Sequence, residues 1–196
     1  MVTIYTATNE IMDACLDFAK KSGQSNDGMY ARRGQTDTMK TMMDRYYGKI
    51  AEWATYDYLT RLKLHPTKPD MKIYDVKDKS FDADIQNAHN DFHVKCCKEE
   101  ENPSWVFQRD SDPLITAPDE MDYIVVTVHS VEFPVQIQIL KVFKAVDVVD
   151  FYDDLFNEQY TKDGKTALYW NGRVDGKNKK ISELENAFQW KHMINS

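Results

Sequence analysis

Residues 81–97, with the sequence FDADIQNAHNDFHVKCC, carry the pattern that decides the fold. Two runs typical of β-strands, Ser80–Gln86 and Phe92–Cys97, flank the segment Asn87–Asn90, which has the composition of a turn. We therefore predict that these residues form a β-hairpin.

Polar side chains alternate along both arms of this hairpin. Because successive residues of a strand point to opposite faces, Asp82 and Asp84 share a face, as do His93 and Lys95 on the other arm. The predicted turn pairs Asp84 with His93, and it pairs Asp82 with Lys95. A carboxylate, an imidazole and an ammonium group on one face can hold a divalent cation beside an amine. This register favours Asp84 over Asp82 as the first ligand, and a slip of one residue would reverse the choice.

Apolar periodicity elsewhere predicts helices on both sides of a strand-rich region. Helices are expected at residues 9–21, 37–63, 145–158 and 182–194, with a loop at 22–35. Within 145–158, residues 146–151 (VDVVDF) could instead extend a strand. Further strands are expected at residues 72–76, 105–108, 123–128 and 135–143. We predict one domain over residues 1–196, with a helical part (1–66), a sheet core (about 70–145) and C-terminal helices with a basic loop (146–196). The expected class is α/β, with a mixed central sheet flanked by helices.

Three features of this region resemble the PD-(D/E)XK nuclease superfamily. Asp84 is followed nine positions later by a ligand-x-Lys tripeptide, His93-Val94-Lys95. The helix before the hairpin contains Gly48-x-x-x-Glu52, and residues 104–108 (SWVFQ) resemble the element that follows the tripeptide. The sequence departs from the family at His93, which occupies the position of the middle acidic residue.

The resemblance implies a restriction-endonuclease-like fold and a metal-dependent endodeoxyribonuclease of the restriction or phage type. The implied metal ligands are Glu52, Asp82, Asp84 and His93, and the implied catalytic residues are Asp84, His93, Lys95 and Glu52. Mg²⁺ is the expected cofactor, with Mn²⁺ as the alternative because Mg²⁺ prefers oxygen ligands to an imidazole nitrogen. Lys95 would orient the attacking water and offset charge on phosphorus. A homodimer is expected, because two symmetric sites match the two strands of a duplex.

Two other interpretations stay open. His93 at an acidic position also suits a non-catalytic protein that keeps the nuclease-like fold and binds nucleic acid or another protein. A zinc-binding protein that uses His93 with Cys96 and Cys97 is a third interpretation. Adjacent cysteines match no structural zinc pattern, which disfavours it.

Charge is distributed unevenly along the chain. The net charge is −7 (25 − 32), whereas residues 30–70 carry +3 (8 − 5) and residues 161–180 carry +4 (6 − 2). Basic side chains near aromatic ones can contact phosphates and bases, so we expect DNA as the partner. The expected DNA contacts are Arg32, Arg33, Lys49, Lys165, Arg173 and Lys177. The acidic residues 147–158 are expected to face away from DNA.

Composition excludes several classes of protein. Aromatic residues make up 12% of the chain, which is too many for a disordered protein. No apolar run approaches the roughly 18 residues of a membrane span, and no signal peptide opens the sequence, so no membrane partner is expected. Three cysteines do not make a disulfide framework, and we therefore expect a cytoplasmic location.

Overall fold

The computed structural model describes residues 3–32, 37–74, 83–98, 104–108, 121–144, 156–160 and 166–171. In chain order, its elements are β1 (Thr3–Thr6), α1 (Asn9–Arg32), α2 (Thr38–Arg61), β2 (Ile85–Gln86), β3 (Asp91–Cys97), β4 (Ser104–Gln108), β5 (Asp122–Ser130), β6 (Gln136–Lys144), β7 (Phe156–Tyr160) and β8 (Thr166–Asn171). Neither α1 nor α2, the helices of the described part, is long and apolar enough to cross a membrane.

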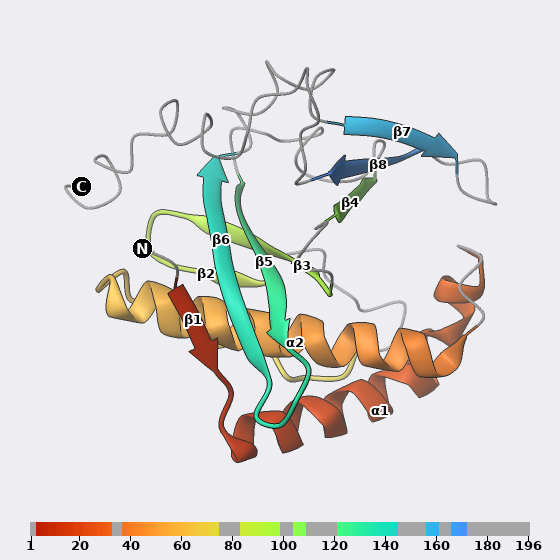
Figure 1. The fold of residues 1–196 in the computed structure, drawn as a ribbon, viewed down its shortest axis with the longest axis horizontal. Helices are drawn as coiled ribbons and strands as arrows, with labels where there is room; N and C mark the ends of the chain where they lie inside the picture. The colour runs from red at the N-terminus through yellow and green to blue at the C-terminus, as the bar shows by residue number, and fades with distance from the viewer. Residues whose placement is uncertain are drawn as a thin grey trace.

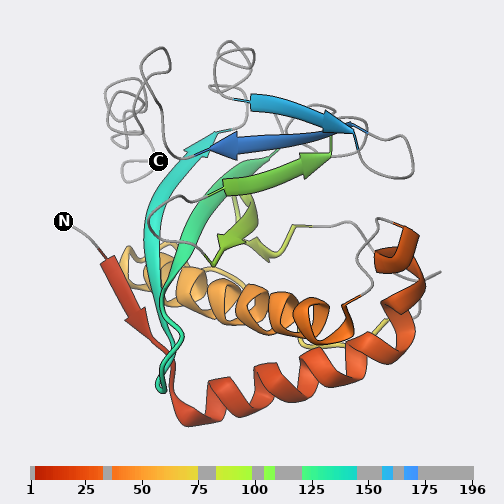
Figure 2. The same ribbon diagram turned by 45° about the vertical axis from the view of Figure 1, so that its right-hand side comes forward.

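A five-stranded mixed sheet forms the centre of the molecule, with strand order β1-β6-β5-β3-β2. Strands β3 and β5 are parallel, and the other neighbours are antiparallel. A smaller sheet, β4-β8-β7, lies at the end of the molecule away from the helices in both views (Figures 1 and 2). The predicted α/β class with a mixed sheet is confirmed.

The predicted hairpin is present with a shorter first arm: β2 has two residues, residues 83–84 of the predicted run form no strand, and residues 80–82 lie outside the described residues. Ile85 in β2 is paired with Phe92 in β3, which is the register expected for a turn at residues 87–90. The turn is closed by a hydrogen bond of 2.9 Å from the amide of Asn87 to the carbonyl oxygen of Asn90. The side chain of Asn87 also accepts hydrogen bonds from the amides of His89 and Asn90, as asparagine does in tight turns. Asn87 therefore fixes the register of the hairpin.

Helix α2 lies across one face of the five-stranded sheet, and α1 packs against α2 (Figure 1). Asp37 caps the start of α2, because its carboxylate accepts a hydrogen bond of 2.9 Å from the amide of Lys40. Apolar side chains from α2, such as Ile50 and Leu59, join Phe92 and other sheet residues in one buried core. One side of α2 therefore packs against the hairpin, and an adjacent side of the same helix faces α1.

Some local predictions were wrong. The helix expected to end at residue 21 continues to Arg32, so residues 22–32 are helical where a loop was predicted. A glycine costs a helix only about 1 kcal/mol relative to alanine, and the contact of α1 with α2 offsets the cost of Gly23. The expected helical part also contains a strand, since β1 pairs with β6 at the sheet edge.

Three further predictions differ from the structure or lie outside it. Residues 72–74 form no strand, although they belong to the predicted strand 72–76. Residues 156–158, the end of the helix predicted at 145–158, belong instead to strand β7, which pairs with β8. Residues 145–155 and the predicted helix at 182–194 lie outside the described residues.

Candidate active site

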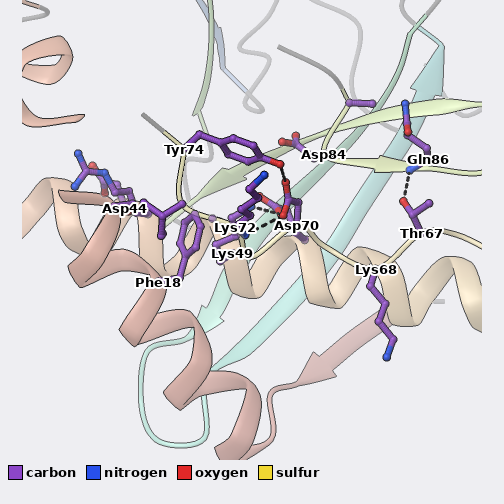
Figure 3. Close-up of a pocket in the computed structure, with 16 residues that line it drawn as sticks. Phe18, Asp44, Lys49, Thr67, Lys68, Asp70, Lys72, Tyr74, Asp84 and Gln86 are labelled. Carbon is purple, nitrogen blue, oxygen red and sulfur yellow. Dashed lines mark hydrogen bonds and ion pairs between the residues drawn. The ribbon is translucent and has the colours of Figure 1, made fainter. Parts of the chain in front are cut away.

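A pocket of about 610 Å³ lies where α1, α2, the segment Thr67–Tyr74 and the start of the hairpin meet (Figure 3). We call it the carboxylate pocket after its acidic lining residues, Asp44, Glu52, Asp70 and Asp84. Its basic lining residues are Arg45, Lys49, Lys68 and Lys72. Figure 3 shows Lys49, Asp70 and Lys72 close together, whereas the side chain of Lys68 points away from them. The pocket therefore combines carboxylates with several nearby cations.

Glu52 is the buried carboxylate of this pocket. It lies on α2 among apolar residues and is 8% exposed, as the apolar sequence around it predicts. Its Oε2 atom is 2.7 Å from the Nζ atom of Lys49, one helical turn earlier. Burial, together with the negative charge of Asp84, raises the pKa of Glu52 to about 8, although Lys49 opposes this shift. A buried, ionised carboxylate destabilises the folded state unless a nearby cation compensates its charge.

Asp84 lies at the edge of strand β3. One of its oxygens, Oδ2, accepts a hydrogen bond of 2.8 Å from the amide of Val94 and lies 3.3 Å from Nδ1 of His93. Because an ionised carboxylate only accepts hydrogen bonds, His93 donates through Nδ1. Burial raises the pKa of Asp84, but the hydrogen bond and charge of His93 outweigh burial and hold this pKa below its usual value. The predicted proximity of Asp84 and His93 is thus present in the structure.

Asp70 is a pocket residue that the sequence analysis missed. Its two carboxylate oxygens accept hydrogen bonds from the hydroxyl of Tyr74 (2.6 Å) and the amide of Lys72 (2.8 Å), as Figure 3 shows for Tyr74. Burial raises its pKa, and these hydrogen bonds outweigh burial and lower it. The available signal was the dipeptide Pro69-Asp70 ahead of Lys72, because aspartate often bonds the amide two residues later.

His93 and Lys95 lie on the sheet face that α2 does not cover. Phe92 belongs to the core beneath α2 and Val94 packs against that core, so pleating directs His93 and Lys95 to the opposite face. The ring centroids of His93 and Tyr123 are 5.7 Å apart, and Nζ of Lys95 is 5.9 Å from the Tyr123 ring centroid. Neither residue is among the described residues that line the carboxylate pocket. The lysine in that pocket beside Glu52 is Lys49.

The carboxylate pocket suits a hydrated Mg²⁺ ion better than a fully protein-ligated one. Within the described ranges, no three His, Cys, Asp or Glu side chains are arranged to hold a metal ion. Mg²⁺, however, usually keeps several waters and is bound by one or two carboxylates. Glu52 and Asp84 supply such oxygens from α2 and from the hairpin, and their repulsion is what a cation would relieve. These two residues fit the ion, whereas His93 uses one ring nitrogen to hold Asp84.

The remaining predicted site residues are distributed as follows. Lys49 lines the carboxylate pocket, and Arg32 is the last residue of α1. The other predicted DNA contacts, Arg33, Lys165, Arg173 and Lys177, lie outside the described residues, as does Asp82. Of the predicted metal ligands, Glu52 and Asp84 line the carboxylate pocket together with Asp70, and His93 contacts Asp84 without lining the pocket.

Comparisons of this chain with models of known protein families, with curated proteins and with solved structures found no match.

Proposed function

We propose that this protein is a metal-dependent endodeoxyribonuclease, similar to the PD-(D/E)XK nucleases, that hydrolyses phosphodiester bonds of DNA at the carboxylate pocket. The observation that carries the proposal is the meeting of buried Glu52 with Asp84 and Lys49 in one pocket. Glu52 and Lys49 come from helix α2, and Asp84 directly precedes strand β2 and is held by a hydrogen bond from the Val94 amide of β3. Rigid supports of this kind place a site precisely. Two carboxylates with an ammonium group form a combination suited to a metal ion and a phosphate.

In this proposal Glu52 and Asp84 would hold a hydrated Mg²⁺ or Mn²⁺ ion. Such an ion lowers the pKa of a bound water and polarises a phosphate oxygen. Asp84 is prepared for this role because His93 and the Val94 amide favour its ionised form. We regard His93 as the residue that orients Asp84, since Nδ1 is directed to its carboxylate.

We assign the role of the catalytic lysine to Lys49. Its side chain is 15% exposed and lies 2.7 Å from Glu52, so its charge acts where solvent screening is weak. Lys95, which the tripeptide suggested, lies on the other sheet face, against Tyr123. Lys49 would offset the charge that develops on the phosphate during hydrolysis, which is electrostatic stabilisation of a transition state.

Cleavage of plasmid and linear duplex DNA tests the proposal, with Mg²⁺, with Mn²⁺ and with a chelator. We expect cleavage with either ion, and a loss of about 100-fold or more for Glu52→Gln, Asp84→Asn and Lys49→Met. Lys21→Met and Asp17→Asn are matched controls, because these residues form an exposed helical ion pair of 2.6 Å on α1. Lys95→Met should retain activity. An inactive wild-type protein with both ions, or full activity of the pocket variants, would contradict the proposal.

The alternative is a non-catalytic protein that binds nucleic acid or another protein through the same pocket. It is favoured by the Lys49–Glu52 ion pair, which neutralises the buried carboxylate without a metal ion. Binding of a labelled duplex without cleavage in any metal ion would support it.

Analytical ultracentrifugation with and without DNA tests the proposed homodimer, for which we expect twice the chain mass of 22.9 kDa.

A further inference from the structure

Gly48 is an interior glycine of α2 that the packing of the protein does not require. Among the described residues, a Cβ atom built at this position meets no atom within 4 Å apart from its own helix backbone and chain neighbours. Alanine would be more stable than glycine inside a helix, so neither a close contact nor helix stability explains the glycine. The open space beside Gly48 belongs to the carboxylate pocket.

Gly48 lies at the centre of the pocket-facing side of α2. Residues four positions apart lie on the same helix face, which places Asp44, Gly48 and Glu52 in one row. Arg45 and Lys49 line the pocket from the neighbouring row. A ligand resting against Gly48 thus has two cations beside it and the buried carboxylate one turn farther along the helix.

The opposite wall of the pocket provides a third cation. Lys72 comes from the segment after α2, and its Nζ atom lies 4.8 Å from the Tyr74 ring centroid. Figure 3 shows Lys72 close to Lys49 and Asp70. Phosphate groups of a nucleic acid strand are attracted by such lysines and arginines, which position the strand.

We infer that the open surface at Gly48 receives the phosphate backbone of the DNA strand that is cut. This inference rests on the proposed function and makes Gly48 a determinant of substrate fit. The amide of a residue inside a helix already donates its hydrogen bond within the helix. Gly48 therefore allows the DNA strand to approach the helix backbone closely but provides no additional hydrogen bond. The absent side chain allows a phosphate to approach Lys49 and Glu52 together, and glycine often serves where a backbone meets a ligand closely.

A series of full-length variants, Gly48→Ala and Gly48→Val, tests the inference by comparing stability with DNA cleavage. We expect Gly48→Ala to raise the Tm by about 2–4 °C, because alanine is the better helix former. We expect it to lower kcat/KM for duplex cleavage about tenfold or more, and Gly48→Val to lower it further. Thr60→Ala is the control, since this exposed residue of α2 also gains helix propensity but does not line the pocket.

The outcomes separate this inference from the proposed function. A more stable Gly48→Ala protein with weakened cleavage, beside a Thr60→Ala protein with normal cleavage, supports the inference. Normal cleavage by both Gly48 variants overturns the inference and leaves the proposed nuclease intact. A destabilised Gly48→Ala protein also overturns it, because the space would then not be open. A wild-type protein that neither binds nor cuts DNA overturns both.

Discussion

Burial raises the pKa of Glu52 to about 8, so this carboxyl group takes up a proton at a higher pH than an exposed glutamate does. The folded state then binds more protons than the unfolded state between pH 4.5, the ordinary value, and pH 8. Stability contributed by this group is therefore fully present below pH 4.5 and is lost as pH rises through 8. The carboxyl group makes the pocket sensitive to pH.

The first prediction concerns this pH dependence. In chelator, the unfolding free energy of the wild-type protein should fall by up to about 3 kcal/mol from pH 5.5 to pH 8 relative to Glu52→Gln. Thermal or urea unfolding at several pH values measures the difference. Parallel stability curves for the two proteins would show that Glu52 titrates normally.

The second prediction concerns the pair of His93 and Asp84. His93→Phe removes the Nδ1 donor, so the pKa of Asp84 should rise and the protein should lose about 1 kcal/mol at pH 7. The loss should disappear in acid, because the stability that comes from a lowered pKa is fully present above the ordinary value of the group and is lost as pH falls through the lowered pKa. Carboxyl chemical shifts and urea unfolding provide the measurements. His89→Phe, at an exposed position in the turn, is the control and should leave Asp84 unchanged.

Individual residues also show how far the sequence predicts the site. Alternation along β3 correctly places His93 and Lys95 on a common face, but it does not reveal which face α2 covers. That choice depends on core packing far along the chain, so the separation of Lys95 from Glu52 was not predictable from local pattern. Asp70 was missed because its segment forms no regular element, and its position depends on contact with the pocket.

At the scale of elements, Asp37 stabilises the start of helix α2 by capping it. Its carboxylate satisfies the amide of Lys40, which has no partner within the helix. Asp37→Ala should lower stability by about 1 kcal/mol and the Tm by about 2–4 °C. Asp37→Asn should retain most of the stability, because asparagine caps helices nearly as well. Equal Tm values for Asp37→Ala and the wild-type protein would contradict this role.

The elements predicted best are those governed by local chemistry. The turn at residues 87–90 and the register it imposes follow from asparagine hydrogen bonding within a few residues. The predicted end of α1 at residue 21 was wrong, because the packing of α1 against α2 outweighs the helix-propensity cost of Gly23. Strand β1 was missed because its four residues are stabilised by pairing with β6 and by the burial of Tyr5 in the core, and both depend on residues distant in the sequence.

At the scale of the whole molecule, metal binding and stability should be linked. The proposed ion at Glu52 and Asp84 would bind only the folded protein, so 10 mM Mg²⁺ is expected to raise the Tm. The gain is about 2.7 kcal/mol at a concentration 100 times the Kd, measured against chelator by thermal unfolding. Glu52→Gln should lose most of the gain, whereas Asp17→Asn should keep it. An equal Mg²⁺ effect on Glu52→Gln would place the ion elsewhere.

The net charge of −7 describes the surface poorly at the pocket. There, four carboxylates and four basic side chains meet, and α2 supplies two of each. A metal ion at the carboxylates would turn this balanced pocket positive. Attraction of a phosphate backbone would then depend on the bound ion as much as on the lysines and arginines.

The carboxylate of Asp84 has a consequence for self-association. Strand β2 is only two residues long, so it leaves the Val94 amide of β3 to be satisfied by Asp84. An uncovered amide at a sheet edge offers a pairing point for a strand of another molecule. Asp84 thus blocks strand addition at this point of the edge. Asp84→Ala, which removes the acceptor, is therefore expected to leave the Val94 amide without this hydrogen bond, whereas the amide oxygen of Asp84→Asn can still accept it.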